Sequence, residues 1–363
     1  MPLHDVGYRG WHGRPRPGGA AGVIATTGIR LAWKSRWLRR VILFAWSPAL
    51  VFAGGFFAFE QAVDEGAVGA GRHVSRRLDG FGLLGSLLAE NLGGSLDDAD
   101  QARRTVWSRL LLAFMRAPQA VLLAVVVGLV APRLIAGDLR AKAWLVYFTR
   151  PVSRGDYVLG KIAVLAAIVS LVTLVPAIVL WLIGVLVSPS VWVAVATWDL
   201  PLRILAAAAV VTIPTVLLAL AYSSLTAETR IAAFAWFATW VACWITHGAL
   251  TGADLAAGSR QTSEVPAALA DPDDPFDDGP AIVRRPLRGP RRLNWLLRAA
   301  GIDGAVDRWA WLSPFHAQGV VQAWIFGIEK RFASVLPSLV SLAAIAGVSL
   351  VVLFLRVDAP ARA

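Results

Sequence analysis

The sequence predicts an all-α polytopic membrane protein with six transmembrane helices, and three observations support this. Hydrophobic residues make up 57% of the 363 residues, and the mean hydropathy is +0.61. Charged residues make up only 16%, whereas a typical soluble domain has about 25%. Six apolar runs approach the roughly 20 residues that a helix needs to cross a bilayer. A soluble globular fold is therefore excluded.

The positive charge of the chain is concentrated in two segments and indicates its orientation. The net charge is +11. Residues 1–40 carry eight Lys or Arg and one acid, and residues 137–161 carry five bases and two acids. Residues 61–116 hold seven bases and seven acids, and residues 252–332 hold ten of each. An excess of Lys and Arg beside spans marks the cytoplasmic side, so the charge predicts orientation and no nucleic-acid binding.

The first 40 residues predict two segments ahead of the first span. Residues 1–25, rich in Gly, Pro and Arg, predict a disordered basic arm. Residues 26–40 place Ile29, Trp33 and Trp37 at helical spacing with bases between them. This pattern predicts an amphipathic helix in the inner membrane interface; the alternative is a basic flank that only sets orientation. The long lead and long apolar run exceed signal-peptide dimensions, so the first span is expected to stay uncleaved.

Six apolar runs are expected to cross the membrane within a transmembrane domain at 41–355. They cover residues 41–60, 117–136, 162–187, 204–223, 231–250 and 332–355, and residues 356–363 form a tail. The second run is the weakest because it contains Arg133, which near a helix end can extend to the headgroups. Six spans place both termini on one side, and the basic arm makes that side the cytoplasm.

Two long segments, 61–116 and 251–331, are expected outside the membrane. The acidic run 271–280 offers oxygen ligands to a hard cation. It lacks the spacing of a calcium-binding loop, and its composition favours a solvated turn. Residues 293–300 and 309–328 are amphipathic and aromatic, which favours the outer interface. No metal site is therefore predicted.

The sequence shows no catalytic constellation. Residues 155–162 nearly match a phosphate loop, but Ile162 stands where the magnesium-binding hydroxyl belongs, and the segment opens a span instead of following a strand. His247, late in the fifth span, has no partner that the sequence identifies, and no polar cluster is expected at mid-depth. Cys243 is expected to be a small apolar residue. The chain is predicted to be non-catalytic, with no cofactor or metal of its own.

Residues 131–161 form a short charged segment between two apolar runs. The sequence there reads APRLIAGDLRAKAWLVYFTRPVSRGDYVLGK. Asp138 near a helix start suits the helix dipole, and Pro151 is expected to end that helix. Its bases suit acidic groups on a partner or anionic lipid heads, or they serve orientation alone; they are Arg150, Arg154 and Lys161.

The same segment resembles the permease subunits of type-2 ABC exporters. An acidic residue after the second span, an R-P-V-S-R turn and a G-K pair opening the third span carry the resemblance, which covers residues 132–161. The W-L-S-P-F-H run at 311–316 is similar to a segment that such permeases carry before the last span. The resemblance implies a coupling helix at 137–156 that docks on a separate ATPase. It implies a coupling role for nine residues: Asp138, Arg140, Arg150, Pro151, Ser153, Arg154, Asp156, Gly160 and Lys161.

The resemblance further implies an exporter built from two permeases, identical or homologous, and two ATPase subunits that bind ATP and magnesium. Short re-entrant helices are then expected before the sixth span. Two alternatives stay open: an ion-coupled secondary transporter, which usually needs membrane-embedded carboxylates that this sequence lacks, and an intramembrane enzyme or a membrane anchor of a larger assembly. Frequent Arg, Ala and Trp indicate a GC-rich bacterial source and hence the inner membrane.

Overall fold

The computed structural model describes residues 19–64, 99–143, 152–263 and 308–358. Their elements are α1 (Gly19–Trp33), α2 (Arg36–Asp64), α5 (Ala99–Leu134), α6 (Ala136–Arg140), α8 (Arg154–Val187), α9 (Val193–Ala196), α10 (Asp199–Leu225), α11 (Thr229–Ser263), the 3₁₀ turn η4 (Ala310–Leu312), α13 (Pro314–Ile325) and α14 (Phe332–Asp358). Six helices within these residues are long and apolar enough to cross a membrane. The predicted all-α polytopic fold is therefore confirmed.

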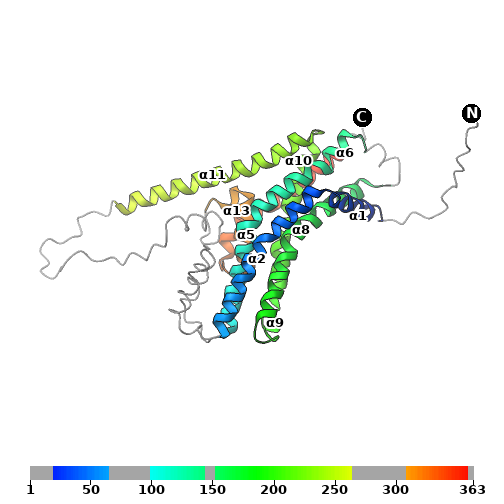
Figure 1. Ribbon diagram of the computed structural model, residues 1–363. Helices are drawn as coiled ribbons and strands as arrows, with labels where there is room; N and C mark the ends of the chain where they lie inside the picture. The colour runs from blue at the N-terminus through cyan, green and yellow to red at the C-terminus, as the bar shows by residue number, and fades with distance from the viewer. Residues whose placement is uncertain (1–18, 65–98, 144–151, 264–307, 359–363) are drawn as a thin grey trace, which may run out of the picture.

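The bundle has two distinct ends. In Figure 1, α1 and α6 lie at one end and the short α9 lies at the other. Val357, near the end of α14, packs against Tyr157 and Val158 at the start of α8, so the last helix also finishes at the end that carries α1. The charge pattern of the sequence predicts that this end faces the cytoplasm.

α5 departs most from the predicted membrane map. Residues 61–116 were expected to form a loop on the outer side of the membrane, but α5 covers 36 residues and begins at Ala99. Its first half is core, since Trp107 and Phe114 are fully buried. Burial is compatible with a base at Arg103 because its Nε donates to both carboxylate oxygens of Glu60, at 3.2 and 3.1 Å.

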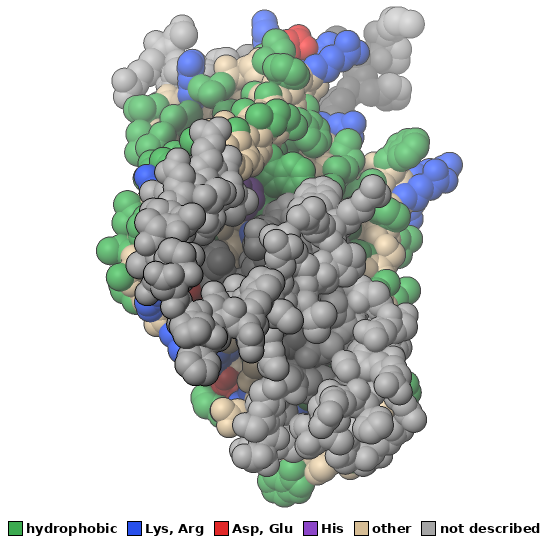
Figure 2. All heavy atoms as spheres, turned by 90° about the vertical axis from the view of Figure 1, so that its left-hand side faces the viewer, with side chains coloured by type: hydrophobic (Ala, Val, Ile, Leu, Met, Phe, Trp, Pro, Cys, Tyr) green, Lys and Arg blue, Asp and Glu red, His purple; other side chains and the backbone are tan. Residues whose placement is uncertain are grey.

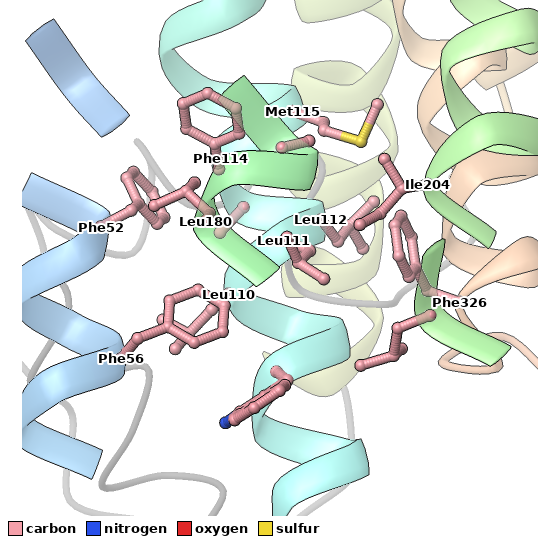
Figure 3. Packing of buried hydrophobic residues seen from close by; sticks show 14 of the residues in the cluster. Phe52, Phe56, Leu110, Leu111, Leu112, Phe114, Met115, Leu180, Ile204 and Phe326 are labelled. Atoms are coloured by element: carbon pink, nitrogen blue, oxygen red, sulfur yellow. The ribbon is translucent and has the colours of Figure 1, made fainter. Parts of the chain in front are cut away.

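The outer half of the core is aromatic. Figure 3 shows Phe52 and Phe56 of α2 directed toward α5, which contributes Phe114 and Leu110. The rings of Phe52 and Phe114 meet edge to face at 5.6 Å between centroids. Edge-to-face contacts add roughly 0.5–1.5 kcal/mol to the burial of such rings. α2 and α5 are thereby fixed side by side over much of their length.

α11 lies apart from the rest of the bundle for part of its length. In Figure 1 it runs at a steep angle to α2 and α8. Its cytoplasmic half is attached to α5: Trp236 is buried, and its indole N–H donates to the carbonyl of Ala124 at 2.9 Å. A Cβ on Gly128 of α5 would lie 2.4 Å from the ring of Phe237, so only glycine permits this close approach.

The residues before the sixth span fold into the domain. The sequence favoured the outer interface for 309–328, but eight residues of α13 are buried. The amide of Gln318 donates to the hydroxyl of Thr215 at 3.1 Å, and that of Gln322 to the carbonyl of Ala207 at 3.3 Å. The polar residues that made this segment look amphipathic are therefore satisfied by α10, because buried amides require partners. The segments 271–280 and 293–300 lie outside the described residues.

Apolar side chains cover much of the coloured surface in Figure 2, and Lys and Arg gather toward its upper end. Large apolar residues are exposed on all six candidate spans, among them Phe44 and Leu50 of α2, Phe234 and Ile245 of α11, and Val351 of α14. A soluble monomer rarely exposes such extended apolar surface. The described surface therefore suits a lipid environment.

Candidate coupling site

The break between α5 and α6 is fixed by a side chain of α10. The backbone N–H groups of Ile135 and Ala136 point to Ser223 Oγ, at 3.3 and 3.0 Å. The hydroxyl of Ser223, which is fully buried, also lies 3.3 Å from the carbonyl oxygen of Pro132 and donates to it. One serine thus satisfies backbone groups that the break releases. The first end of the predicted coupling segment is therefore tied to α10.

α6 ends in a left-handed turn. Lys142 has φ 51°, the one non-glycine residue with positive φ among the described residues. The N–H of Ala143 reaches the carbonyl of Asp138 at 3.0 Å, and that of Lys142 reaches Leu139 at 3.2 Å. This is the pairing of a Schellman motif. The helix predicted over 137–156 is therefore interrupted: α6 is five residues long, and residues 144–151, with Arg150 and Pro151, lie outside the described residues.

α8 begins at Arg154, whereas the sequence placed the third span from residue 162. The reason is a capping arrangement at Ser153: its Oγ accepts the backbone N–H of Asp156 at 3.0 Å and donates to the Asp156 carboxylate at 2.7 Å. Asp156 in the first turn also suits the positive helix end. The near match to a phosphate loop at 155–162 is thus part of a helix, and its glycines form no loop.

An ion pair joins the two sides of the segment. Lys161 Nζ lies 2.7 Å from Asp138 Oδ2, and the hydroxyl of Tyr157 donates to the same oxygen at 2.9 Å. The side chains of Lys161 and Asp138 are only 10% and 21% exposed. Lys161 was predicted to serve a partner or lipid heads, but in the structure its partner is Asp138 of α6. Tyr157 lies one turn before Lys161 on α8 and contacts the same carboxylate oxygen. We call this group of three residues the cytoplasmic latch.

Arg140 and Arg154 keep exposed positions beside the latch. Arg140 Nη1 lies 4.0 Å from Glu228 Oε2 at the start of α11, and both side chains are more than half exposed. Such a pair contributes little, about 0–1 kcal/mol. Of the predicted coupling residues, Arg140 and Arg154 are therefore the ones on the described surface that suit a partner, while Ser153, Asp156, Gly160 and Lys161 organise α8.

α1 braces the start of α8 through two glycines. A Cβ on Gly160 would lie 2.7 Å from Ile24 Cγ2, and a Cβ on Gly28 would lie 2.5 Å from Val164 Cγ2. Each helix therefore places a branched side chain on the glycine of the other. The structure differs from the helix predicted at 26–40, because α1 occupies Gly19–Trp33 and residues 19–25 are helical instead of disordered. A second helix, α2, follows Ser35, whose hydroxyl lies 3.4 Å from the backbone nitrogen of Leu38.

A second group of polar residues lies deep inside the domain, where the sequence predicted none. Arg116, His247 and His316 are 2%, 8% and 6% exposed. The rings of His247 and His316 stack at 3.4 Å with an interplanar angle of 13°. The sequence identified no partner for His247, and in the structure that partner is His316. The sequence carried one signal for this buried polar group, because Arg116 is an ionisable residue in the apolar run LLLAFMRAP. It carried none for the position of His316, which depends on how α13 packs in the fold.

The described residues contain no group of three or more His, Cys, Asp or Glu that could hold a metal ion. Cys243, on α11, is a half-buried free thiol. The acidic run 271–280, which offered oxygen ligands, lies outside the described residues. Short helices, a helix cap and one ion pair hold the segment between the second and third spans at one end of the bundle.

Fold and site together define a multi-pass helical membrane protein with a braced segment between its second and third spans. Residues 36–359 match the ABC-2 family transporter protein, so the chain belongs to that family of ABC transporter membrane components. No curated protein matches the chain. The resemblance first seen over residues 132–161 thus extends across nearly the whole chain.

Proposed function

We propose that this chain is the permease subunit of an ABC exporter in a bacterial inner membrane, with both termini in the cytoplasm. A separate ATPase, which supplies the ATP and magnesium chemistry, docks on the segment 137–161. A second permease, identical or homologous, completes the transporter. The chain itself is non-catalytic.

The observation that carries the proposal is the bracing of both ends of that segment. The bend before α6 is bonded to α10 through Ser223, and the start of α8 is bonded to α6 through the latch and packed on α1 through Gly160. A partner that pushes on residues between these ends moves several helices at once. Without such connections, a push would be absorbed locally, since coupling needs a packed path between two sites.

The exposed charges support docking of the ATPase at this end of the bundle. Arg140 and Arg154 are exposed at this end of the bundle, where they suit carboxylates on the docking surface of an ATPase. The latch holds the backbone that carries them. We infer that the ATPase dimer closes on ATP, pulls or presses the segment, and tilts α8 together with α6 and α1.

The test is co-purification from the native membrane in mild detergent, with ATP hydrolysis and peptide identification as readouts. The wild-type chain is expected to carry a phosphate-loop ATPase. The variant Arg150→Glu/Arg154→Glu is expected to lose it through charge repulsion, which typically weakens such contacts by about 2–5 kcal/mol when buried at an interface.

A matched control reverses two bases outside the segment, in the Lys34→Glu/Arg36→Glu variant between α1 and α2. It changes net charge equally and should retain the ATPase. A folded wild-type chain with no ATPase attached contradicts the proposal. Equal loss in both double variants contradicts docking at 137–161, because it shows that overall charge at this end is what matters.

A further inference from the structure

The buried polar residues around the first turn of α13 lie at mid-depth in the domain. The candidate span of α2 starts at Arg36 and has 26 residues. At about 1.5 Å per residue, Phe52 lies about 24 Å from the start of that span. Phe114 of α5 meets Phe52. Arg116 follows Phe114 by two residues, one step nearer the cytoplasm. Ionisable side chains at such depth are rare and usually functional.

The guanidinium of Arg116 lies against the first turn of α13. Its Nη1 donates to the carbonyl of Phe315 at 2.6 Å, and its Cζ stands 4.2 Å from the centre of the Phe315 ring. A Cβ on Gly319 would overlap the guanidinium at 2.0 Å, so glycine at this position makes room for the charge. The N-terminal end of a helix is itself positive. Two positive features therefore meet at one buried place.

Ser313, directly before the first turn of α13, supplies a donor that the described protein does not use. It is the N-cap residue of α13 and is 1% exposed, yet its side chain makes no capping bond. Within the described part of the chain, its hydroxyl has no hydrogen-bond partner. A buried unsatisfied hydroxyl costs about 1–3 kcal/mol, a cost that a bound acceptor removes. The N–H groups of the first turn of a helix are further donors at its N-terminal end.

The surroundings of these donors are aromatic and apolar. The Phe315 ring contacts Trp240 of α11, with centroids 5.8 Å apart, and it meets the His316 ring edge on at 4.9 Å. His316 in turn stacks on His247. In Figure 2 a histidine side chain shows only as a small purple patch, in line with the low exposure of both rings. A ligand here meets a few donors inside an apolar shell, the usual composition of a small-molecule site.

We propose that the first turn of α13, with Arg116 and Ser313, binds the acidic group of an amphipathic anion, a phosphate or carboxylate carried on an apolar body, and that this is the class of molecule transported. The inference rests on the proposed transport function and names the substrate class. The guanidinium and the Ser313 hydroxyl hold the acidic group, and the rings of Phe315 and Trp240 hold the apolar part. α11, which lies apart from α2 and α8 in Figure 1, forms the side from which the ligand enters.

The test is ligand-dependent thermal stabilisation of the purified chain in a neutral maltoside detergent, since a ligand that binds the folded state raises its melting temperature. The probes are dodecyl phosphate, dodecyltrimethylammonium and inorganic phosphate. Dodecyl phosphate is expected to stabilise the wild type in a saturable way, and the other two are not. Equal stabilisation by the cation, or by inorganic phosphate alone, overturns the proposal.

Two variants locate the effect. Arg116→Gln should weaken the apparent affinity for dodecyl phosphate at least about tenfold, and Ser313→Ala about fivefold, as expected for loss of one bond to a charged group. Arg104→Gln, on the same helix but exposed, is the control and should keep the wild-type response. Undiminished stabilisation of Ser313→Ala contradicts the site.

If Arg116→Gln does not fold, Ser313→Ala still tests the proposal. Because the hydroxyl has no internal partner, its removal should leave the unliganded melting temperature unchanged or slightly higher, while a purely structural role would lower it. The same preparations are examined for the co-purifying ATPase. Loss of the anion response with the ATPase still bound separates failure of this site from failure of the exporter proposal.

Discussion

The charge pattern predicts an outer and a cytoplasmic end for the bundle. Each of these ends carries an ion pair between two helices, and the two pairs have different surroundings. At the outer end, Glu60 and Arg103 join α2 to α5 with side chains only 1% and 8% exposed. Next to them, the rings of Phe56 and Trp107 meet at 5.4 Å. The outer pair is thus enclosed by packed aromatic residues.

The cytoplasmic latch is placed differently. Asp138 is 21% exposed, and the segment beside it is the proposed docking site. The third member of the latch is Tyr157, which contributes a hydroxyl hydrogen bond to Asp138. A pair near water can open and close at modest cost, whereas a pair sealed in the core cannot. The comparison indicates that the outer end is a fixed joint and the cytoplasmic end an adjustable one.

The largest effect is expected from Glu60→Ala, which leaves Arg103 as a buried charge without its carboxylate. Removal of one member of a buried pair costs about 3–5 kcal/mol, and the melting temperature in detergent should fall accordingly. The double variant Glu60→Leu/Arg103→Leu should recover most of the loss because no charge is then buried. A double variant as unstable as the single one would show that Arg103 has a further essential role.

Asp138→Asn tests the adjustable end. Loss of the charged acceptor for Lys161 should cost about 1.5–3 kcal/mol, less than at the outer pair because both side chains are nearer to water. Once the ATPase complex is in hand, its turnover should fall more than its stability. Lys34→Gln is the control, since Lys34 is exposed, lies outside the segment 137–161 and also loses one charge. Equal effects of the two variants would remove the latch from the coupling path.

Gly160→Val tests whether α1 is part of the cytoplasmic end. The added branches meet Ile24 and must displace α1, at a cost of about 1–3 kcal/mol for overpacking. Gly22→Ala is the matched control on α1, because nothing lies within 4 Å of its Cβ. It should stabilise the helix by about 0.5–1 kcal/mol. Faster proteolysis of α1 in the Gly160→Val variant alone would show detachment, and identical proteolysis would contradict the brace.

The smallest effect is expected from Lys142→Gly. Lys142 has a φ of 51°, which L-residues adopt at a cost and glycine does not, so the variant should gain about 0.5–1 kcal/mol. Ala141→Gly is the control, since Ala141 has φ −79° and gains nothing from glycine. Thermal unfolding distinguishes the two; a loss of stability in Lys142→Gly would indicate that the lysine side chain makes a contact that matters more than its backbone.

Much of the membrane map could be predicted from sequence because it depends on local composition. Apolar runs of sufficient length must be helices in lipid, and the runs at 162–187 and 332–355 lie inside α8 and α14. The differences fall where charges occur in helices. The sequence placed Arg103 and Arg116 in an outer loop, and in the structure both are buried in α5, because partners distant in sequence satisfy them.

The candidate coupling site divides in the same way. Its location between the second and third spans followed from charge and from the resemblance over 132–161. The roles inside it did not: Lys161 looked like a docking base and is instead bonded to Asp138, and Ser223 of α10 had no local signal at all. Pairing across α6, α8 and α10 depends on helix rotation, which no single stretch encodes.

The sequence by itself determined that this protein is a helical membrane protein, which end its bases mark, and which family it resembles. These follow from composition, run length and a contiguous motif. The resemblance implied short re-entrant helices before the sixth span, but the tertiary structure alone decided that His247 stacks on His316 and that Arg116 lies against the first turn of α13. Such contacts join residues more than sixty positions apart, and their energies depend on burial and geometry that exist only after the helices have packed.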